Sequence, residues 1–242
     1  MLSVAASSLV LCVGIECWSW CVVQEKRREG KQRREAALTR GSMKGDSIKR
    51  PEETGQRMRS RPNIIVTGTP GVGKSLHAQA LARESGLAHL CINDLVKQDG
   101  LHEGWSDEYR SYIVDDERVV ATTLPLLQQG GQVIDWHICD VFPLADIDLV
   151  CVLRTDHSIL YDRLQARGYA PSKLEENMDA EIMEVVAEEA RGAYHAEQVV
   201  ELRSEDEADL RGNIERLLVW IADWEKDNEK EFYPEPRRSR QA

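Results

Sequence analysis

The chain has 242 residues, of which 42% are hydrophobic and 30% are charged, so its length suits one sizeable domain with tails rather than two full domains. The charge is uneven, because residues 1–61 hold 13 Lys and Arg against 7 Asp and Glu, whereas residues 62–242 hold 18 against 35. A folded part this acidic argues against broad or sequence-specific nucleic-acid binding through its own surface.

The N-terminal 61 residues differ in composition from the rest. Residues 2–23 form an apolar run, interrupted by a glycine and a glutamate, and a basic segment follows over residues 26–61. The run is close to membrane-spanning length, so a signal anchor is one interpretation. We favour a disordered extension, or an upstream translated segment with Met43 or Met58 as the working start, because no positive region precedes the run and no cleavage site follows it. Membrane attachment is therefore not expected.

The six cysteines form no C-x-x-C pair and show no zinc spacing. Three lie in the N-terminal segment and three in apolar runs further on. This pattern favours a reducing compartment with buried or incidental thiols.

The sequence from Pro62 reads P-N-I-I-V-T-G-T-P-G-V-G-K-S and contains a complete G-x-x-x-x-G-K-[ST] pattern between Gly68 and Ser75. A strand is expected over Asn63–Thr67, and a helix is expected up to Ser85. This order of strand, glycine-rich loop and helix is typical of a phosphate-binding loop. The alternative is a β–α turn that binds nothing, and we reject it because every fixed position and both flanking elements agree.

Each residue type in this loop has a chemical reason to be there. Glycines let consecutive backbone N–H groups point at an anion, and the following helix adds its own N-terminal N–H groups. Lys74 supplies a charge for the β- and γ-phosphate oxygens of ATP, and the Ser75 hydroxyl is a hard oxygen ligand suited to Mg²⁺. The predicted nucleotide-binding residues of the loop are Gly71, Val72, Gly73, Lys74, Ser75 and Leu76.

The rest of the chain alternates short apolar runs with helical patterns. Further strands are expected at His89–Ile92, Gln132–Asp135, Leu149–Leu153 and Val199–Leu202. Helices are expected after Asn93-Asp94, from Asp115-Asp116 to about Gln129, over Asp156–Arg167, from after Asn177 to about Gln198, and over roughly Glu207–Asp227. A polar, aromatic-bearing stretch follows at 100–113, a strongly polar stretch at 168–177 precedes the next helix, and a flexible tail is expected at 229–242. The pattern predicts an α/β fold of the P-loop NTPase type, a three-layer sandwich with a five-stranded parallel sheet, which binds ligands at the carboxyl ends of its strands.

A second candidate site group lies in Val133-Ile134-Asp135-Trp136-His137. An apolar strand that ends in Asp135 places a carboxylate beside the phosphate loop, where it can hold the hydration shell of Mg²⁺. His137 would point the same way if the strand continued, and could orient a water. The alternatives are a strand-end turn residue for Asp135 and a structural histidine for His137.

Three arginines could supply charge to transferring phosphates. Arg154 follows the fourth strand, and Arg163 and Arg167 are four residues apart on the next helix. Arg167 is the preferred phosphate clamp, because a hinge at Gly168 would let it move with a closing lid. The alternative for any of them is a solvated helix face.

These motifs carry a family resemblance. The runs N-I-I-V-T-G-T-P-G-V-G-K-S, V-I-D-W-H-I-C-D-V-F-P and L-Y-D-R-L-Q-A-R-G-Y resemble the adenylate kinase isoenzyme 6 family from about Pro62 to Asp227, and the D-x-H step is the most specific part. Members of that family are small P-loop nucleoside monophosphate kinases with additional ATPase activity, linked to small ribosomal subunit maturation. The resemblance implies a kinase domain over 62–228, adenylate-kinase-like, with a monophosphate-binding segment near 91–114 and a short lid near 166–176.

The same resemblance implies ATP and Mg²⁺ as cofactors, AMP or a related monophosphate as acceptor, and catalytic roles for Lys74, Asp135, His137 and Arg167. It further implies a small-subunit ribosomal protein and the pre-40S particle as partners, a monomer, and a location in nucleus and cytoplasm. Two positions depart from the family pattern. Leu76 stands where a second Thr is usual, and Glu205-Asp206-Glu207 stands where a base-side Lys is frequent.

The expected activity is phosphoryl transfer from ATP to AMP, with intrinsic ATP hydrolysis. One alternative is an ATPase assembly factor whose main act is binding a ribosomal protein, and another is a different small-molecule P-loop kinase. A small GTPase is disfavoured, because no N-K-x-D guanine-reading motif occurs.

Overall fold

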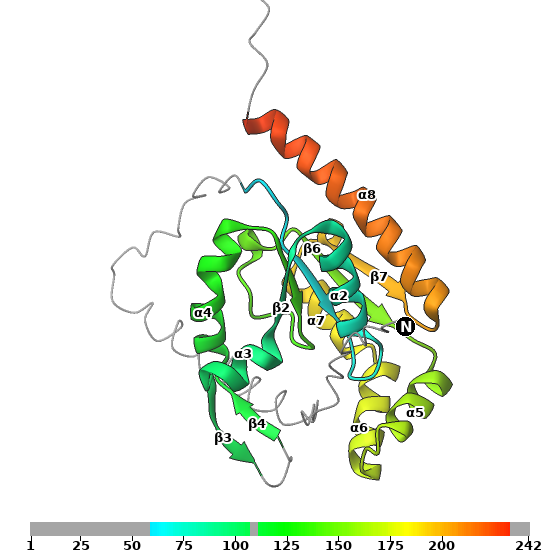
Figure 1. Cartoon of the computed structure of the whole chain (residues 1–242). Coiled ribbons are helices and arrows are strands. Elements are labelled where there is room, and N and C mark those ends of the chain that lie inside the picture. The colour runs from blue at the N-terminus through cyan, green and yellow to red at the C-terminus, as the bar shows by residue number, and fades with distance from the viewer. Residues whose placement is uncertain (1–58, 107–110, 233–242) are drawn as a thin grey trace, which may run out of the picture.

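The computed structural model describes residues 59–106 and 111–232, and its centre is a five-stranded parallel sheet (Figure 1). The strands are β1 (Ile64–Thr67), β2 (Ala88–Cys91), β5 (Gln132–Asp135), β6 (Leu149–Arg154) and β7 (Val199–Arg203). Their order across the sheet is β2-β5-β1-β6-β7, and every neighbouring pair is parallel. The predicted five-stranded parallel sheet is confirmed. The strand β1 lies at its centre, so the loop that follows β1 emerges between two neighbouring strands.

Helices cover both faces of this sheet. They are α2 (Lys74–Ser85), α3 (Ile92–Asp99), α4 (Asp116–Gln129), α5 (His157–Ala166), α6 (Pro171–Ile182), α7 (Val185–Ala193) and α8 (Glu207–Phe232), with short 3-10 turns at Leu144–Asp146 and Ala196–Gln198. Because side chains alternate along a strand, Ile64 and Val66 pack with α2, α5 and α8, whereas Ile65 packs with α3, α4 and α7. The predicted three-layer sandwich is therefore confirmed.

The polar, aromatic-bearing stretch 100–113 contains an antiparallel hairpin of β3 (His102–Ser106) and β4 (Ser111–Val114), for which no strands were predicted. Trp105 pairs with Tyr112 across the hairpin, and their rings lie 5.2 Å apart in an edge-to-face arrangement. Such aromatic cross-strand pairs stabilise a hairpin whose sequence is otherwise polar, which explains why hydrophobic alternation did not predict it.

The prediction of a non-helical polar stretch at 168–177 is wrong beyond its first residues. The helix α6 begins at Pro171, whose missing N–H costs nothing at the first helical position. Leu174 and Met178, one turn apart, pack against the core on the α5 side of the sheet. The segment is polar on its buried side as well, because Lys173 and Asn177 are buried and the Asn177 amide donates to the Lys173 carbonyl oxygen at 2.6 Å.

The contacts of the folded domain begin before Pro62. Arg59 is 6% exposed, and its Nη2 donates to both carboxylate oxygens of Asp148 at 2.8 and 2.9 Å. The predicted apolar run 2–23 and most of the basic segment lie outside the described residues, as does the tail from 233 onward. Among the helices of the described ranges, none is long and apolar enough to cross a membrane.

Candidate functional site

The loop between β1 and α2 has the backbone of an anion-binding turn. Gly68, Gly71 and Gly73 have φ values of 141°, 102° and 102°, a region that L side chains rarely adopt. A Cβ on Gly68 would lie 2.7 Å from the Leu153 carbonyl oxygen, and a Cβ on Gly71 would lie 2.8 Å from Leu160 Cδ1. Only glycine therefore fits these positions, and the loop can turn its N–H groups inward.

Lys74 is the first residue of α2, and it lies at the loop as the sequence predicts. It is 7% exposed, and its Nζ donates to the Thr69 carbonyl oxygen at 3.3 Å. Ser75 follows in the first helical turn, while Leu76 points its side chain out of the core and is 65% exposed. The loop therefore presents one cation and one hydroxyl at a helix N-terminus, which is a favourable place for phosphate.

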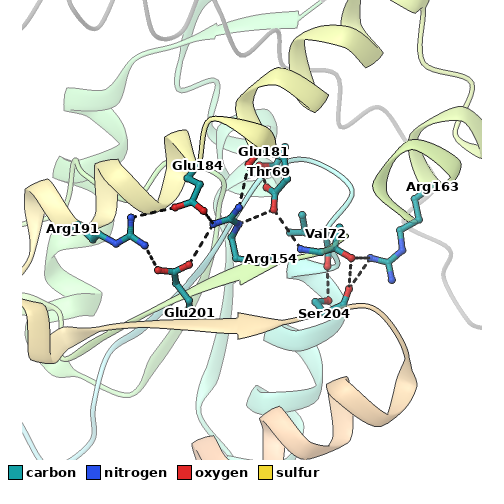
Figure 2. Close-up of polar contacts among 10 residues, drawn as sticks. Thr69, Val72, Arg154, Arg163, Glu181, Glu184, Arg191, Glu201 and Ser204 are labelled. Carbon is teal, nitrogen blue, oxygen red and sulfur yellow. Dashed lines mark hydrogen bonds and ion pairs between the residues drawn. The ribbon is translucent and has the colours of Figure 1, made fainter. Parts of the chain in front are cut away.

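The segment after β7 holds the phosphate loop in place. The Ser204 hydroxyl donates to the Val72 carbonyl oxygen at 2.6 Å, so Val72, predicted to bind nucleotide, also anchors the loop to the domain. Arg163 donates to the carbonyl oxygen of Ser204 at 2.9 Å (Figure 2). It also donates to the carbonyl oxygen of Glu205 at 2.6 Å. Arg163 thereby holds the segment after β7, and its guanidinium also lies 3.5 Å from the Gly71 carbonyl oxygen of the phosphate loop. Its role in supplying charge to phosphates stays a prediction.

Arg154 is an arginine whose predicted role the structure does not support. Its Nε donates to Glu181 at 2.8 Å, and its Nη1 lies 3.2 Å from Glu184 and 3.4 Å from Glu201 (Figure 2). Three carboxylates surround one guanidinium, so its charge is compensated inside the protein. Sequence reasoning could not see this, because the three acids lie 27 to 47 residues away along the chain.

Arg167, the predicted phosphate clamp, is the C-terminal cap residue of α5 and is exposed. Gly168 follows with φ 71°, and a Cβ there would meet nothing within 4 Å. The structure therefore places Arg167 at a turn between α5 and α6. Its role as a clamp stays a prediction.

Asp135 ends β5 beside the phosphate loop, because Val66 of β1 pairs with Asp135 in the parallel register. The carboxylate is 3% exposed, and its Oδ2 accepts no hydrogen bond from the part of the chain that the structure describes. The imidazole Nε2 of His89, on the neighbouring strand β2, lies 3.5 Å from this oxygen. A buried carboxylate oxygen is costly unless something satisfies it, so Asp135 fits the hydration shell of a bound Mg²⁺.

His89 was not predicted, since only the pairing of β2 with β5 brings it to Asp135. Within the ranges 59–106 and 111–232, no group of three or more His, Cys, Asp or Glu side chains could hold a metal ion without other ligands. A Mg²⁺ ion at this edge would therefore take most of its oxygen ligands from Ser75, phosphates and water.

His137 lies in a bend after β5, so the strand does not continue and the alternation argument for its direction fails. It is 3% exposed, and its ring contacts the Trp136 ring edge-on at 5.8 Å. The residue is therefore buried two positions beyond Asp135, and its role in orienting a water stays a prediction.

His77 is a further buried residue at the loop that the sequence did not single out. The Asn213 amide nitrogen donates to the Arg203 carbonyl oxygen at 2.7 Å, which orients the amide, and it lies 3.2 Å from His77 Nε2. Nε2 then accepts, and Nδ1 carries the proton and donates to the Gly73 carbonyl oxygen at 3.1 Å. Burial lowers the pKa of His77 below its ordinary value, although the hydrogen bond to Gly73 acts in the opposite direction. A neutral imidazole thus ties the start of α2 to α8.

Comparisons with known proteins agree with this geometry. A family model described as an AAA domain matches residues 64–184. The chain is 44% identical over 174 residues to the adenylate kinase isoenzyme 6 homolog of Schizosaccharomyces pombe, which covers 72% of this chain and 99% of the relative. It is 46% identical over 164 residues to the adenylate kinase isoenzyme 6 homolog FAP7 of Saccharomyces cerevisiae, which covers 67% of this chain and 83% of the relative. The chain belongs to the adenylate kinase isoenzyme 6 family.

The resemblance expected from the motifs is thereby confirmed, and this member of the adenylate kinase isoenzyme 6 family is a P-loop kinase by family and by fold. Among solved structures, the shikimate kinase from Acinetobacter baumannii in complex with shikimate is 16% identical, with a TM-score of 0.49 over 69% of this chain and 96% of that chain. The fold assignment itself rests on the sheet order and the phosphate loop described above.

Proposed function

We propose that this protein transfers the γ-phosphoryl group of ATP to AMP, forming two ADP, and that it also hydrolyses ATP slowly. The observation that carries the proposal is the juxtaposition of the glycine-bounded phosphate loop with Asp135, whose buried Oδ2 accepts no hydrogen bond from the described residues. The names of the curated relatives, adenylate kinase isoenzyme 6 homologs, support AMP as the acceptor.

The side chains at the site have separate roles that suit phosphoryl transfer. Lys74 stabilises negative charge that develops on the transferring group, and the loop N–H groups hold the neighbouring phosphates. Ser75 and Asp135 would hold Mg²⁺, which neutralises phosphate charge when it is bound. These residues position the reacting atoms and compensate charge, and the chemistry requires no covalent intermediate with the protein.

The positions of the β3–β4 hairpin and of the α5–α6 helix pair also favour an acceptor site near the phosphate loop. In Figure 1 the β3–β4 hairpin and the α5–α6 pair both project at the end of the sheet where the phosphate loop lies. The hairpin falls within the expected monophosphate-binding segment 91–114, and α6 begins within the expected lid 166–176. This placement suits an acceptor that approaches the phosphate loop from the side of these elements.

The test is a turnover screen of ATP against a panel of monophosphates and against water alone, with wild type and Lys74→Ala. We expect AMP to be the best acceptor and Lys74→Ala to lower turnover by about 10²-fold or more, because the loop loses a charge that compensates the transferring group. Circular dichroism should show an unchanged fold. Near-normal turnover by folded Lys74→Ala would exclude the phosphate-loop assignment.

A role beside the ribosome is a further part of the proposal. Residues 62–242 are strongly acidic, with 35 Asp and Glu against 18 Lys and Arg, which suits a basic partner such as a small-subunit ribosomal protein. We infer a monomer that acts on pre-40S particles in nucleus and cytoplasm. Co-sedimentation with pre-40S particles at two salt concentrations tests the partner, and fluorescence of the tagged chain tests the location. A chain that stays in the top fractions at low salt would contradict the ribosomal role.

A further inference from the structure

Glu181 is a buried carboxylate at the end of α6 that none of the roles above uses. Its side chain is 2% exposed, although it lies close to a site for anionic phosphates. Its Oε1 accepts from Arg154 Nε at 2.8 Å and from the Thr155 backbone N–H at 3.4 Å. Its Oε2 accepts a short hydrogen bond from the hydroxyl of Thr69, the second residue of the phosphate loop (Figure 2). One side chain therefore joins α6, β6 and the loop.

The end of α6 is held in place by a second layer of ion pairs. Glu184, in the turn between α6 and α7, has φ 54°, the only positive φ on a residue other than glycine in the described ranges. Its carboxylate lies 3.2 Å from Arg154 and 3.5 Å from Arg191, and both arginines also contact Glu201 on β7. A strained backbone persists only where its surroundings determine it, so this turn is firmly positioned against the sheet.

Thr69 connects this fixed point to the reacting groups. While its hydroxyl donates to Glu181, its carbonyl oxygen accepts from Lys74 Nζ at 3.3 Å and from the Val72 backbone N–H at 3.3 Å. A change in the backbone dihedral angles at Thr69 would move the carbonyl oxygen that accepts from Lys74 and would change the turn of the loop. The position of Lys74 thus depends on what holds Thr69.

We propose that Glu181 is a positioning residue for the phosphate loop, which it holds through Thr69 and thereby ties to the α6 end of the lid segment. A buried ion pair adds little net stability compared with apolar residues, whereas it specifies one geometry well. Glu181 is compensated by Arg154, so it can accept from Thr69 without presenting net charge to the phosphates. This role rests on the proposed function, since the loop that Glu181 holds is the ATP site.

The first test compares Thr69→Val, Thr69→Ser and a matched control, Thr123→Val. Valine removes the hydroxyl at nearly constant shape, and serine keeps it. Thr123 is equally buried, but its hydroxyl bonds only backbone oxygens of its own helix α4. We expect Thr69→Val to bind the ATP analogue AMP-PNP roughly tenfold more weakly in calorimetry, because a hydrogen bond to a carboxylate is lost. Thr69→Ser and Thr123→Val should bind like wild type.

The second test needs no nucleotide. Amide hydrogen exchange of residues 178–184 in the nucleotide-free protein should be about tenfold faster in Thr69→Val than in wild type, and unchanged in Thr123→Val. If wild type does not bind AMP-PNP, the proposed function fails, and this exchange measurement alone decides whether Thr69 and the end of α6 are linked. Unchanged exchange in Thr69→Val, or serine as weak in binding as valine, would overturn the role of Glu181.

Glu181→Gln keeps the inference testable should Thr69→Val not fold. A glutamine amide has one acceptor oxygen, so it must present an N–H group either to Arg154, which is itself only a donor, or to Thr69, whose hydroxyl then accepts and leaves its own proton without the carboxylate. We expect weaker AMP-PNP binding than in wild type, and no further loss when Thr69→Val is added. Fully additive losses in the double variant would show that the two residues act separately and would overturn the proposal.

Discussion

Asp135 and His137 are both buried at the carboxyl end of β5, yet they should not serve the two activities equally. Kinase and hydrolase reactions both need Mg²⁺ held against the phosphates, and Asp135 Oδ2, which accepts no hydrogen bond within the described part of the chain, is available for it. Only hydrolysis needs a water to be oriented, because a monophosphate brings its own nucleophilic oxygen, and an imidazole is suited to that task.

We therefore predict that Asp135→Ala lowers both activities, by about 10²-fold, and that His137→Ala lowers ATP hydrolysis more than AMP phosphorylation. Parallel steady-state assays with and without AMP check this, with Asp223→Ala on the exposed face of α8 as the control. Equal losses of both activities in His137→Ala would mean that the histidine only supports the architecture of the site.

His77 gives the stability of the protein a pH dependence of known sign. Since burial lowers the pKa of His77 from 6.5, the unfolded chain binds its proton more tightly than the folded one. Between the folded and unfolded pKa values the unfolded state holds more protons, so the free energy of unfolding rises with pH there. The contribution is complete above about pH 6.5 and is lost as the pH falls below that value.

The measurement is urea unfolding between pH 5.5 and 7.5 for wild type and His77→Gln. We expect the stability of wild type to fall more steeply with decreasing pH, the two slopes differing by at most about 1.4 kcal/mol per pH unit. Parallel curves would show that His77 is not buried as a neutral imidazole.

At the scale of elements, some glycines occupy positions with a positive φ that other residues rarely adopt, and others occupy ordinary helical positions. Gly71 has φ 102°, and a Cβ there would lie 2.8 and 2.9 Å from Leu160 and Leu164 of α5. Gly192 lies in α7 with no positive φ, and a Cβ there would meet nothing within 4 Å. The backbone of the phosphate loop therefore requires glycine at position 71, whereas the backbone of α7 does not require it at position 192.

We predict that Gly71→Ala lowers the free energy of unfolding by about 1 to 3 kcal/mol, through backbone strain and contact with α5. Gly192→Ala should raise it by roughly 0.5 to 1 kcal/mol, because alanine favours a helix. Urea titration of both variants checks the signs. A stable Gly71→Ala protein that binds ATP normally would contradict the close fit of the loop to α5.

At the scale of the whole molecule, the first described residue, Arg59, takes part in a buried ion pair. Arg59 is buried against Asp148 and also donates to the Ala145 carbonyl oxygen at 3.0 Å. Burial raises the pKa of Asp148, and the Asn63 backbone N–H and the Arg59 charge oppose that rise. Without Arg59, the buried carboxyl would lose its compensating charge.

We predict that deletion of residues 1–57 leaves a soluble, active enzyme, whereas deletion of residues 1–61 does not. In the full chain, Arg59→Ala should cost about 3 to 5 kcal/mol, because one partner of a buried pair is removed. Arg83→Ala, which removes an exposed arginine paired with Glu84, should change stability by less than about 1 kcal/mol. Thermal melting and ATP turnover of the four proteins are the measurements.

The outcome for the first deletion also bears on the apolar run 2–23. If the full chain needs detergent and the shortened chain does not, the signal-anchor interpretation is correct and the disordered-extension interpretation is wrong. If the shortened chain does not fold, residues before Met58 take part in the domain.

The sequence by itself determined the features that depend on neighbouring residues. Local order of strand, glycine-rich loop and helix predicted the site of Lys74 and Ser75, and an apolar run ending in Asp135 predicted a carboxylate at the same sheet edge. Alternation of strands and helices predicted the parallel sheet, because βαβ units leave few other arrangements. Each of these patterns involves residues close together in the chain, so it can be recognised in the sequence without knowledge of the tertiary structure.

Only the tertiary structure decided which polar groups meet. Thr69 and Glu181 are 112 residues apart, His77 and Asn213 are 136 apart, and Arg154 reaches acids on α6, β7 and the α6–α7 turn. Sequence reasoning therefore treated Arg154 and Arg163 as free charges, and it missed His89 beside Asp135. The physical reason is that a side chain's role depends on its partners, and hydrogen bonds and ion pairs between distant segments leave no periodic signal in the chain.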